Sequence, residues 1–189
     1  MIHIRDISEI QSGAYLKPAP DPNAYYLLVN DFDNEGNILH TTKPSVVADG
    51  KAHNHFLREG DLLFAAKGNK NFCTIIQKEY EAKSIASSSF LVLRIKDKSI
   101  VFPEFLCWYL NLSATLQKLS DFAVGTSMPS ITKAMLEGVE INLPALDIQK
   151  KIVDVAELQK KERLLYEGIT FRRKQIIDYK LKNIITNGE

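Results

Sequence analysis

The feature that most restricts the fold is a long stretch near the C-terminus without helix breakers. From Asp147 to Ile185 the chain contains no proline and only one glycine, Gly168. Proline and glycine interrupt helices more than any other residues, so the stretch predicts one helix of roughly 55 Å at 1.5 Å per residue. Asp147 is expected to cap this helix, because its carboxylate can accept from the free amides of the first turn.

The predicted helix carries an apolar stripe. Two charged runs, beginning at Lys160 and at Arg172, interrupt the stripe, so it is not a clean heptad repeat. An isolated helix gains little stability from propensity alone, and the stripe therefore needs a second surface. That surface is either a partner or the chain's own domain. The residues expected to face a partner are Ile148, Ile152, Val155, Leu158, Leu165, Ile169 and Ile176.

The residues before this helix predict a domain that begins with strands and continues with helices. Apolar residues from Pro103 to Leu119 recur at helical spacing, and a short helix around 132–136 and a strand at 139–143 follow. The fold class is therefore α+β: a mixed domain over residues 1–146 and a single long helix over residues 147–186. Runs of β-branched and aromatic residues between polar turns predict the strands: Tyr25–Val29, Asp61–Ala66, Phe72–Ile76 and Phe90–Ile95.

Charge is distributed unevenly along the chain. The formal net charge is only +1, but residues 67–98 carry a net charge of +4 and the flanking residues 1–66 and 99–147 are acidic. Residues 148–189 carry another +4. Because screening limits distant charges to about 8 to 10 Å, a local basic patch can still attract phosphate. An ordinary solvated surface would also account for this distribution.

Several classes of protein are disfavoured. No apolar run approaches the roughly 20 residues that span a bilayer, and the N-terminus lacks the features of a secretory signal, so we expect a cytoplasmic protein. Cys73 and Cys107 are expected to be buried apolar residues rather than a disulfide framework or zinc ligands. His53 and His55 could lie on one face of a strand, but no third ligand follows, and a polar loop is the preferred interpretation.

The chain also lacks the motifs of the enzymes that act on DNA. A glycine-rich cofactor loop and an Asn/Asp-Pro-Pro-aromatic motif, which an adenine methyltransferase needs, are both absent, and there is no ATP-binding loop. Asp21, Asp31 and Asp33 could be considered for a nuclease centre, but no Glu-x-Lys follows, so they are interpreted as turn residues. We therefore expect no catalytic residues, cofactor or metal.

Three stretches, in order, resemble the specificity (S) subunit of type I restriction-modification systems. Residues 4–14 are similar to the family's "Leu-x-Asp-Ile-x-x-Ile-x-x-Gly" opening, and residues 57–68 to its "Leu-x-x-Gly-Asp-Ile-Leu" strand with the glycine loop that follows. The third stretch joins residues 125–131 to residues 136–153. It resembles "Gly-x-x-x-x-x-Ile … Leu-x-x-Ile-x-Ile-Pro-x-Pro-Pro-x-x-x-Gln-x-x-Ile".

The resemblance implies a DNA target recognition domain followed by a helix that acts as spacer and docking surface for modification (methyltransferase) subunits, and through them for the restriction subunit. Family members typically hold two such domains and two helices, whereas this chain holds one of each. We therefore expect a homodimer through antiparallel long helices, reading two identical half-sites. Two alternatives stay open: an adaptor or anti-restriction protein of the same fold, and a detached recognition domain of a methyltransferase.

Loops are expected to carry the contacts to double-stranded DNA, with Lys or Arg at phosphates and polar side chains at base edges. The first candidate loop is 67–71, the second lies around 126–128, and the third precedes the strand at 90–95. A fourth candidate consists of Gln11, Ser12, Tyr15 and Lys17. The predicted DNA-binding residues are Lys67, Gly68, Asn69, Lys70, Asn71, Lys83, Ser87, Ser88, Thr126, Ser127 and Met128.

Overall fold

The computed structural model describes residues 1–33, 36–68, 70–81, 83–122 and 130–187. The chain divides into two compact units, Met1–Lys150 and Lys151–Glu189. The first unit is the mixed α+β domain that the sequence predicts. The second consists of the greater part of one helix, α5 (Leu146–Asn187), which begins at the end of the first unit. None of the described helices is both long enough and apolar enough to span a lipid bilayer.

A four-stranded antiparallel sheet forms the centre of the first unit. Its strand order is β2-β7-β4-β5. Short runs of β-branched, aromatic and other apolar residues identify three of these strands in the sequence, and β2 lies in the stretch that resembles the family's opening motif. Their bounds are β2 (Ser8–Ser12), β4 (Leu62–Ala65), β5 (Cys73–Ile75) and β7 (Phe90–Ile95).

Two small sheets flank the central one. β3 (Tyr25–Leu27) pairs in parallel with β6 (Ser84–Ala86), and β1 (Ile2–His3) pairs antiparallel with β8 (Glu140–Ile141). The second pair joins the two ends of the domain, so the N-terminus lies beside the segment that leads into α5. Short 3-10 helices occupy Val29–Asp31, Gly50–His55 and Lys78–Tyr80.

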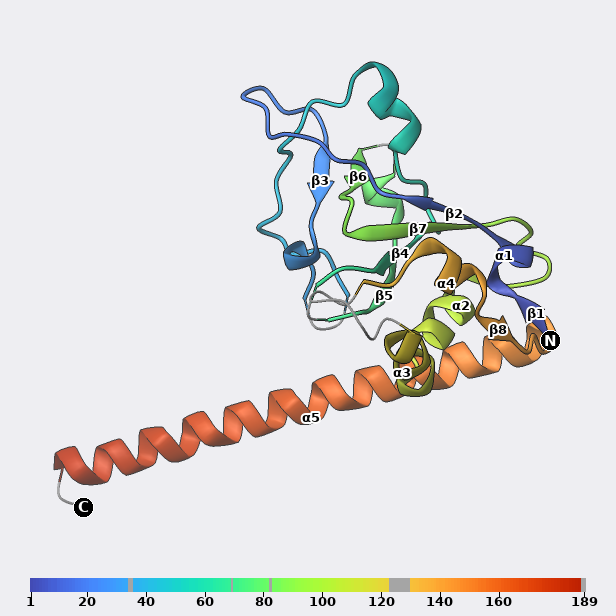
Figure 1. Ribbon diagram of the computed structural model, residues 1–189. Helices are drawn as coiled ribbons and strands as arrows, with labels where there is room; N and C mark the ends of the chain where they lie inside the picture. The colour runs from blue at the N-terminus through green and yellow to red at the C-terminus, as the bar shows by residue number, and fades with distance from the viewer. Residues whose placement is uncertain (34–35, 69, 82, 123–129, 188–189) are drawn as a thin grey trace. The chain divides into compact units, whose positions relative to one another are not determined.

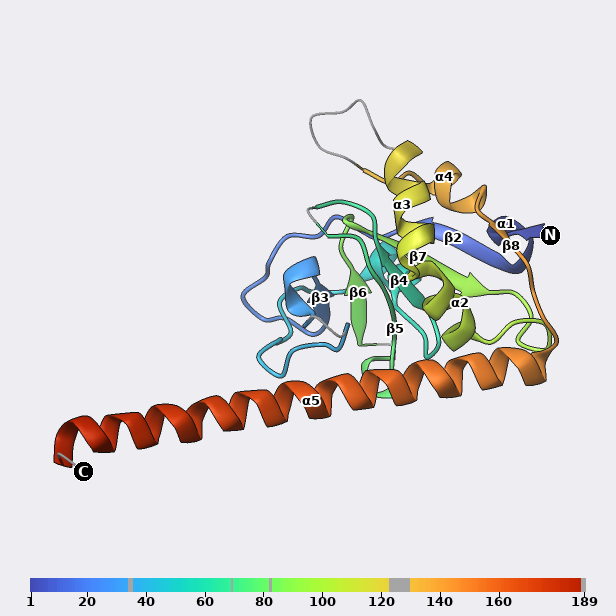
Figure 2. The ribbon, with the colours of Figure 1, turned by 90° about the horizontal axis from the view of Figure 1, so that it is seen from below.

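Both faces of the central sheet are buried. On one face, Leu63, Ala65 and Val92 pack with Leu27 and Ala86 of the β3–β6 pair. The alternate residues of β4 and β7 are buried as well, with α2 against β5 and α4 against β2. Figures 1 and 2 show β3 and β6 on one side of the sheet and α2 and α4 on the other. The uninterrupted apolar run of β4 follows from this double coverage.

One predicted helix is interrupted in the structure. The stretch predicted as one helix from Pro103 is two, α2 (Pro103–Leu110) and α3 (Ser113–Phe122). The break falls at Asn111, whose side chain accepts from the Cys73 amide at 2.9 Å and donates to the Cys73 carbonyl at 2.8 Å. Asparagine is a poor residue inside a helix because it competes for backbone groups, and here it binds the edge of β5.

The other predicted helices form near their expected ranges, but the expected cap of α5 does not form. The short helix predicted around 132–136 is α4 (Lys133–Glu137), and Thr132 caps it by accepting from the Met135 amide. A second short helix, α1 (Ile4–Ile7), is not among the predicted elements. Asp147 does not cap α5, because the helix begins one residue earlier and places Asp147 in its first turn. A carboxylate there still favours the positive end of the helix dipole.

The two cysteines differ from each other. Cys73 is buried, as expected, but Cys107 is only half-buried, and its thiol donates to the Cys73 carbonyl at 3.4 Å. The expectation that both side chains are buried is therefore wrong for Cys107. It lies on α2, the helix that packs against β5.

Candidate nucleic-acid interface

Four loop segments meet at one end of the central sheet, which we call the Ser12 end. The strand register pairs Ser12 with Leu91, Ala65 with Phe90 and Phe64 with Cys73. The last residues of β2 and β4 therefore lie beside the first residues of β7 and β5. The segments that enter or leave the sheet here are 13–17, 66–71 and 87–89, and backbone hydrogen bonds add the segment 130–132 to them.

Backbone hydrogen bonds hold the four segments together. The Gly13 amide donates to the Phe90 carbonyl at 3.0 Å, and the Ala66 amide donates to the Ser89 carbonyl at 2.9 Å. The amide of Ile131 donates to the Ala66 carbonyl at 2.9 Å, next to an isolated bridge between Lys67 and Ser130. The described parts of three candidate regions, 11–17, 67–71 and 87–89, thus contribute to the Ser12 end or adjoin it.

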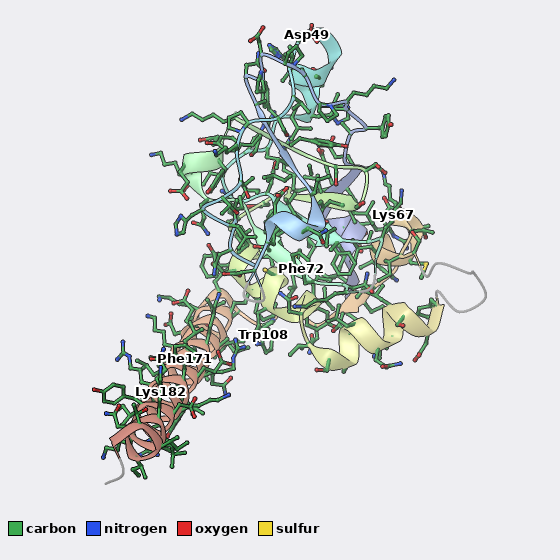
Figure 3. All side chains as sticks on the ribbon, turned by 90° about the vertical axis from the view of Figure 1, so that its left-hand side faces the viewer. Asp49, Lys67, Phe72, Trp108, Phe171 and Lys182 are labelled. Atoms are coloured by element: carbon green, nitrogen blue, oxygen red, sulfur yellow. The ribbon has the colours of Figure 1, made fainter. Side chains whose placement is uncertain are left out.

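The described residues at the Ser12 end carry positive charge only. Lys17, Lys67 and Lys70 are exposed, and no acidic residue occurs in the described parts of 11–17, 66–71, 87–89 and 130–132. No ion pair joins Lys17 or Lys67 to another described side chain. Figure 3 shows Lys67 near the outside of the domain and Phe72, four positions beyond Gly68, deeper inside it. Exposed cations such as Lys17 and Lys67 provide a surface suited to phosphate.

Tyr15 projects from a firmly held backbone. Its side chain is 77% exposed. On its two sides, the Ala14 amide donates to the Ala86 carbonyl at 2.9 Å, and the Leu16 amide donates to the hydroxyl of Tyr26 at 3.3 Å. The same hydroxyl donates to the Ala14 carbonyl at 2.9 Å. An aromatic ring is therefore presented to solvent beside Lys17 on a fixed support.

The close packing beneath Tyr15 explains the glycine before it. A Cβ atom at Gly13 would lie 2.1 Å from the Ser87 carbonyl oxygen and 2.6 Å from that of Ala86. Only glycine lets the chain approach this closely. The family-like opening motif ends on this glycine, so its physical role is to seat the segment 13–17 against the strand β6 and the residues that follow it.

Several predicted contact residues take other roles. Ser87 is 3% exposed, and its hydroxyl has no hydrogen-bond partner among the described residues, so it lies beneath the surface. Ser88 is half-buried. The side-chain Nδ2 of Asn71 donates to the Ala65 carbonyl at 2.7 Å and holds its own loop. Lys83 is exposed but precedes β6, at the opposite end of that strand from Ser87 and Ser88.

The other predicted DNA-binding residues divide into two groups. Gly68 adopts a φ of 117° and a Cβ there would meet nothing within 4 Å, so the loop uses a backbone conformation that favours glycine in open space. Asn69, Thr126, Ser127 and Met128 lie outside the described residues. The segment 130–132, which follows the last three, is at the Ser12 end.

The residues considered for metal or nuclease chemistry have structural roles or stand apart. The carboxylate of Asp31 accepts from the Leu28 amide at 2.8 Å, and that of Asp33 accepts from the Asn37 amide at 2.9 Å, which confirms them as turn residues. His53 and His55 belong to a 3-10 helix, and the His53 ring lies against Phe56. The described part of the chain contains no group of three or more side chains able to hold a metal ion.

The predicted partner-facing residues of the helix are open to solvent. Six of the seven are more than 40% exposed, and Ile152 is half-buried. The described residues 151–187 therefore show a long apolar surface without a covering element of their own unit. The exposed six are Ile148, Val155, Leu158, Leu165, Ile169 and Ile176.

Sequence reasoning missed the residue that anchors the start of this helix. Gln149 is fully buried. Its Oε1 accepts from the Phe102 amide at 3.0 Å, and its Nε2 donates to the carbonyls of Ile100 and Pro144, each at 2.9 Å. The sequence contains a signal for this residue, because Gln149 occupies the position of the glutamine in the third family-like stretch.

Comparison with known proteins identifies the family. Residues 1–183 match the model of the type I restriction modification DNA specificity domain. The chain belongs to this family. A protein of Mycoplasma pneumoniae assigned as a type I specificity subunit is 27% identical over 180 residues, which are 93% of this chain and 54% of that protein. The chain thus spans about half the length of this relative. Specificity subunits are in general not catalytic.

Solved structures of type I systems share the fold. The HsdS subunit from Thermoanaerobacter tengcongensis aligns with a TM-score of 0.63 and 21% identity, covering 88% of this chain and 43% of that subunit. The S subunit from M. genitalium aligns with a TM-score of 0.58 and 15% identity, covering 84% and 38%. Both confirm the mixed domain followed by a long helix as a specificity-subunit fold.

Proposed function

We propose that the chain binds double-stranded DNA at the Ser12 end and supplies half of the sequence specificity of a type I restriction-modification complex. The observation that carries the proposal is the convergence of four loop segments into one surface with exposed lysines and no acidic residue among its described parts. Membership of the DNA specificity family supports the same assignment. The chain would act without a catalytic centre of its own, in the cytoplasm.

Different residues of this surface would serve affinity and specificity. Lys17, Lys67 and Lys70 are exposed and would neutralise phosphates, which positions the domain without reading sequence. Tyr15 would contact bases, since its ring is exposed on a fixed backbone. The predicted contributions of Asn69, Thr126, Ser127 and Met128 remain part of the proposal. We assign no DNA contact to Ser87, which is buried, to Asn71, which holds its own loop, or to Lys83, which lies at the other end of β6.

The long helix would dock the modification subunits and, through them, the restriction subunit. Its uncovered apolar surface supports this role. A further fold match, with a TM-score of 0.56 and 19% identity, comes from a structure that addresses complex assembly and conformational transition of a type I system. We also propose that two copies of the chain associate through this helix, so that one assembly carries two recognition domains and reads two half-sites.

Methylome mapping provides the decisive test. The chain is expressed with cognate modification subunits, and the methylated sequence is compared with that of cells lacking the chain. A methylated motif that appears only when the chain is present is expected. Assembly with the modification subunits without any sequence preference would instead identify an adaptor and would overturn the proposed function.

Salt-dependent binding tests the surface itself. Lys67→Ala is compared with Lys98→Ala, which removes an exposed lysine near the opposite end of the sheet. Loss of one phosphate contact should flatten the slope of log affinity against log salt by about 0.9, for Lys67→Ala only. Equal slopes in Lys67→Ala and the wild type would remove the lysine loop from the interface.

A further inference from the structure

The exposed face of the long helix contains a regular stripe of ten residues. Positions that alternate by three and four residues lie on one face of a helix, as in the seam of a coiled coil. Six of the ten are apolar side chains with exposed fractions between 49% and 68%. The stripe consists of Lys151, Val155, Leu158, Glu162, Leu165, Ile169, Arg172, Ile176, Tyr179 and Asn183.

The four polar members of this stripe are arranged symmetrically. Glu162 and Arg172 each lie five residues from Glu167, one before it and one after it. Lys151 and Asn183 each lie sixteen residues from the same position. The apolar members obey the same symmetry in pairs: Leu165 with Ile169, Leu158 with Ile176, and Val155 with Tyr179.

We propose that the stripe binds the same stripe of a second copy, antiparallel, with the twofold axis at Glu167. Each Glu162 then faces the partner's Arg172, and the remaining positions meet apolar with apolar and polar with polar. The alternating steps of three and four residues give the stripe two kinds of seam position. Every pair in this register joins one position of each kind, so the alternation is kept across the pair. The proposal rests on the two-copy assembly of the proposed function, with the antiparallel direction expected from the family resemblance, and adds the register and the residues that set it.

Competing arrangements place charges badly. In a parallel pair in register, Glu162 would face the partner's Glu162, and Arg172 the partner's Arg172. In an antiparallel pair shifted by one heptad, Arg172 would face an apolar residue, either Val155 or Ile169 of the partner subunit. A charge buried without its counterpart costs several kcal/mol, whereas a polar pair at a seam position fixes register and orientation. Charge complementarity therefore selects the symmetric register.

Two features of the single chain are consistent with this pair. Neither Glu162 nor Arg172 forms an ion pair or hydrogen bond with another described residue. Gly168 lies one residue from the proposed axis, and a Cβ there would meet nothing within 4 Å. A glycine inside a helix costs about 1 kcal/mol relative to alanine, and at the axis its missing side chain leaves room for the second backbone.

Charge reversal in the full-length chain tests the register. Glu162→Arg alone and Arg172→Glu alone each place like charges in two layers, whereas the double variant restores both pairs in reversed order. Sedimentation equilibrium should show a dimer dissociation constant raised roughly tenfold to hundredfold in each single variant and near wild type in the double variant. An equimolar mixture of the two single variants should form a heterodimer as stable as the wild-type pair.

Matched controls and contrary outcomes are available. Glu167→Arg and Lys174→Glu make the same kinds of charge change on the helical face opposite the stripe, and they should leave dimerisation unchanged. Single variants that dimerise like the wild type, or a double variant that does not recover, would overturn the register. A wild-type chain that is monomeric at micromolar concentration would overturn the pairing itself. The methylome test of the proposed function is independent of either result.

Discussion

Arg94 binds both carboxylate oxygens of Asp61, with Nε donating to Oδ1 at 2.8 Å and Nη2 to Oδ2 at 2.6 Å. Asp61 precedes β4 and Arg94 lies on β7, so the pair joins two neighbouring strands at the end of the sheet opposite Ser12. The Asp61 side chain is 2% exposed and that of Arg94 is 26% exposed. Arg94 is thus neutralised within the domain, whereas Lys17 and Lys67 at the Ser12 end are exposed to solvent.

Removal of the Asp61 charge should destabilise the domain strongly. Asp61→Asn leaves Arg94 partly buried without a counter-charge and weakens the bond that the carboxylate accepts from the Arg58 amide. We expect a loss of about 3 kcal/mol in the free energy of unfolding, measured by urea denaturation. The double variant Asp61→Asn, Arg94→Met should be less destabilised than the sum of the two single changes. Additive losses would show that the two side chains are not coupled.

Gln149 should be as important for stability as a core residue. Gln149→Ala leaves the Phe102 amide and the carbonyls of Ile100 and Pro144 without their buried partner. We expect a loss of about 3 kcal/mol by urea denaturation. Gln159→Ala, an exposed glutamine on the same helix, should change stability by less than about 0.5 kcal/mol. Comparable effects of the two changes would argue against an anchoring role.

Tyr15 should contribute to sequence preference rather than to general affinity. On a duplex carrying the methylated motif, Tyr15→Ala should lower the preference over an unrelated duplex by about tenfold, which corresponds to about 1.4 kcal/mol. The salt slope should not change, because no phosphate contact is lost. Ile100→Ala removes an exposed apolar side chain outside the Ser12 end and should leave the preference intact. An unchanged preference in Tyr15→Ala would exclude a base contact.

The two cysteines should react in a fixed order. Burial raises the pKa of the Cys73 thiol well above its usual value, and the neighbouring Cys107 raises it further. The native protein should therefore be alkylated at the half-buried Cys107 first, with Cys73 reacting only as the domain unfolds. Mass spectrometry of partly alkylated protein measures this order. Faster labelling of Cys73 would contradict its burial.

The same raised pKa makes stability depend on pH. The unfolded chain releases the Cys73 proton above about pH 8.5, while the folded chain retains it. The unfolded state then binds fewer protons, so the free energy of unfolding decreases as pH rises through this range. Cys73→Ala should reduce the decrease. If the free energy of unfolding of Cys73→Ala decreases with pH as much as that of the wild type, the decrease comes from other ionisable groups.

Periodicity predicted most of the elements correctly, because each depends on local pattern. The strands β4, β5 and β7 lie within the predicted ranges, and the long helix extends one residue beyond its predicted range at each end. The break at Asn111 could not be predicted from the residues of its own helix. It depends on Cys73, which lies 38 positions earlier in the chain, and only the fold brings the two together.

The candidate interface shows the same division. Lys67, Gly68 and Tyr15 could be singled out because glycine, lysine and aromatic residues in loops have readable chemistry. The burial of Ser87 could not be predicted from the sequence, because it depends on the approach of Gly13 from another loop. Lys83 and Ser88 are close in sequence, yet the intervening strand β6 places them at opposite ends. Spacing along the chain does not reveal which end of a short strand faces a ligand.

The hydrogen bonds between Asn111 and Cys73 also determine how this molecule can associate. β5 is the last strand of the central sheet, and an edge strand with free amides and carbonyls is a template for adding another chain. The asparagine side chain occupies both backbone groups of Cys73, as an incoming strand would. Self-association by strand addition is thereby opposed at that position. At this part of the β5 edge, contacts with another molecule are left to side chains, which discriminate between partners.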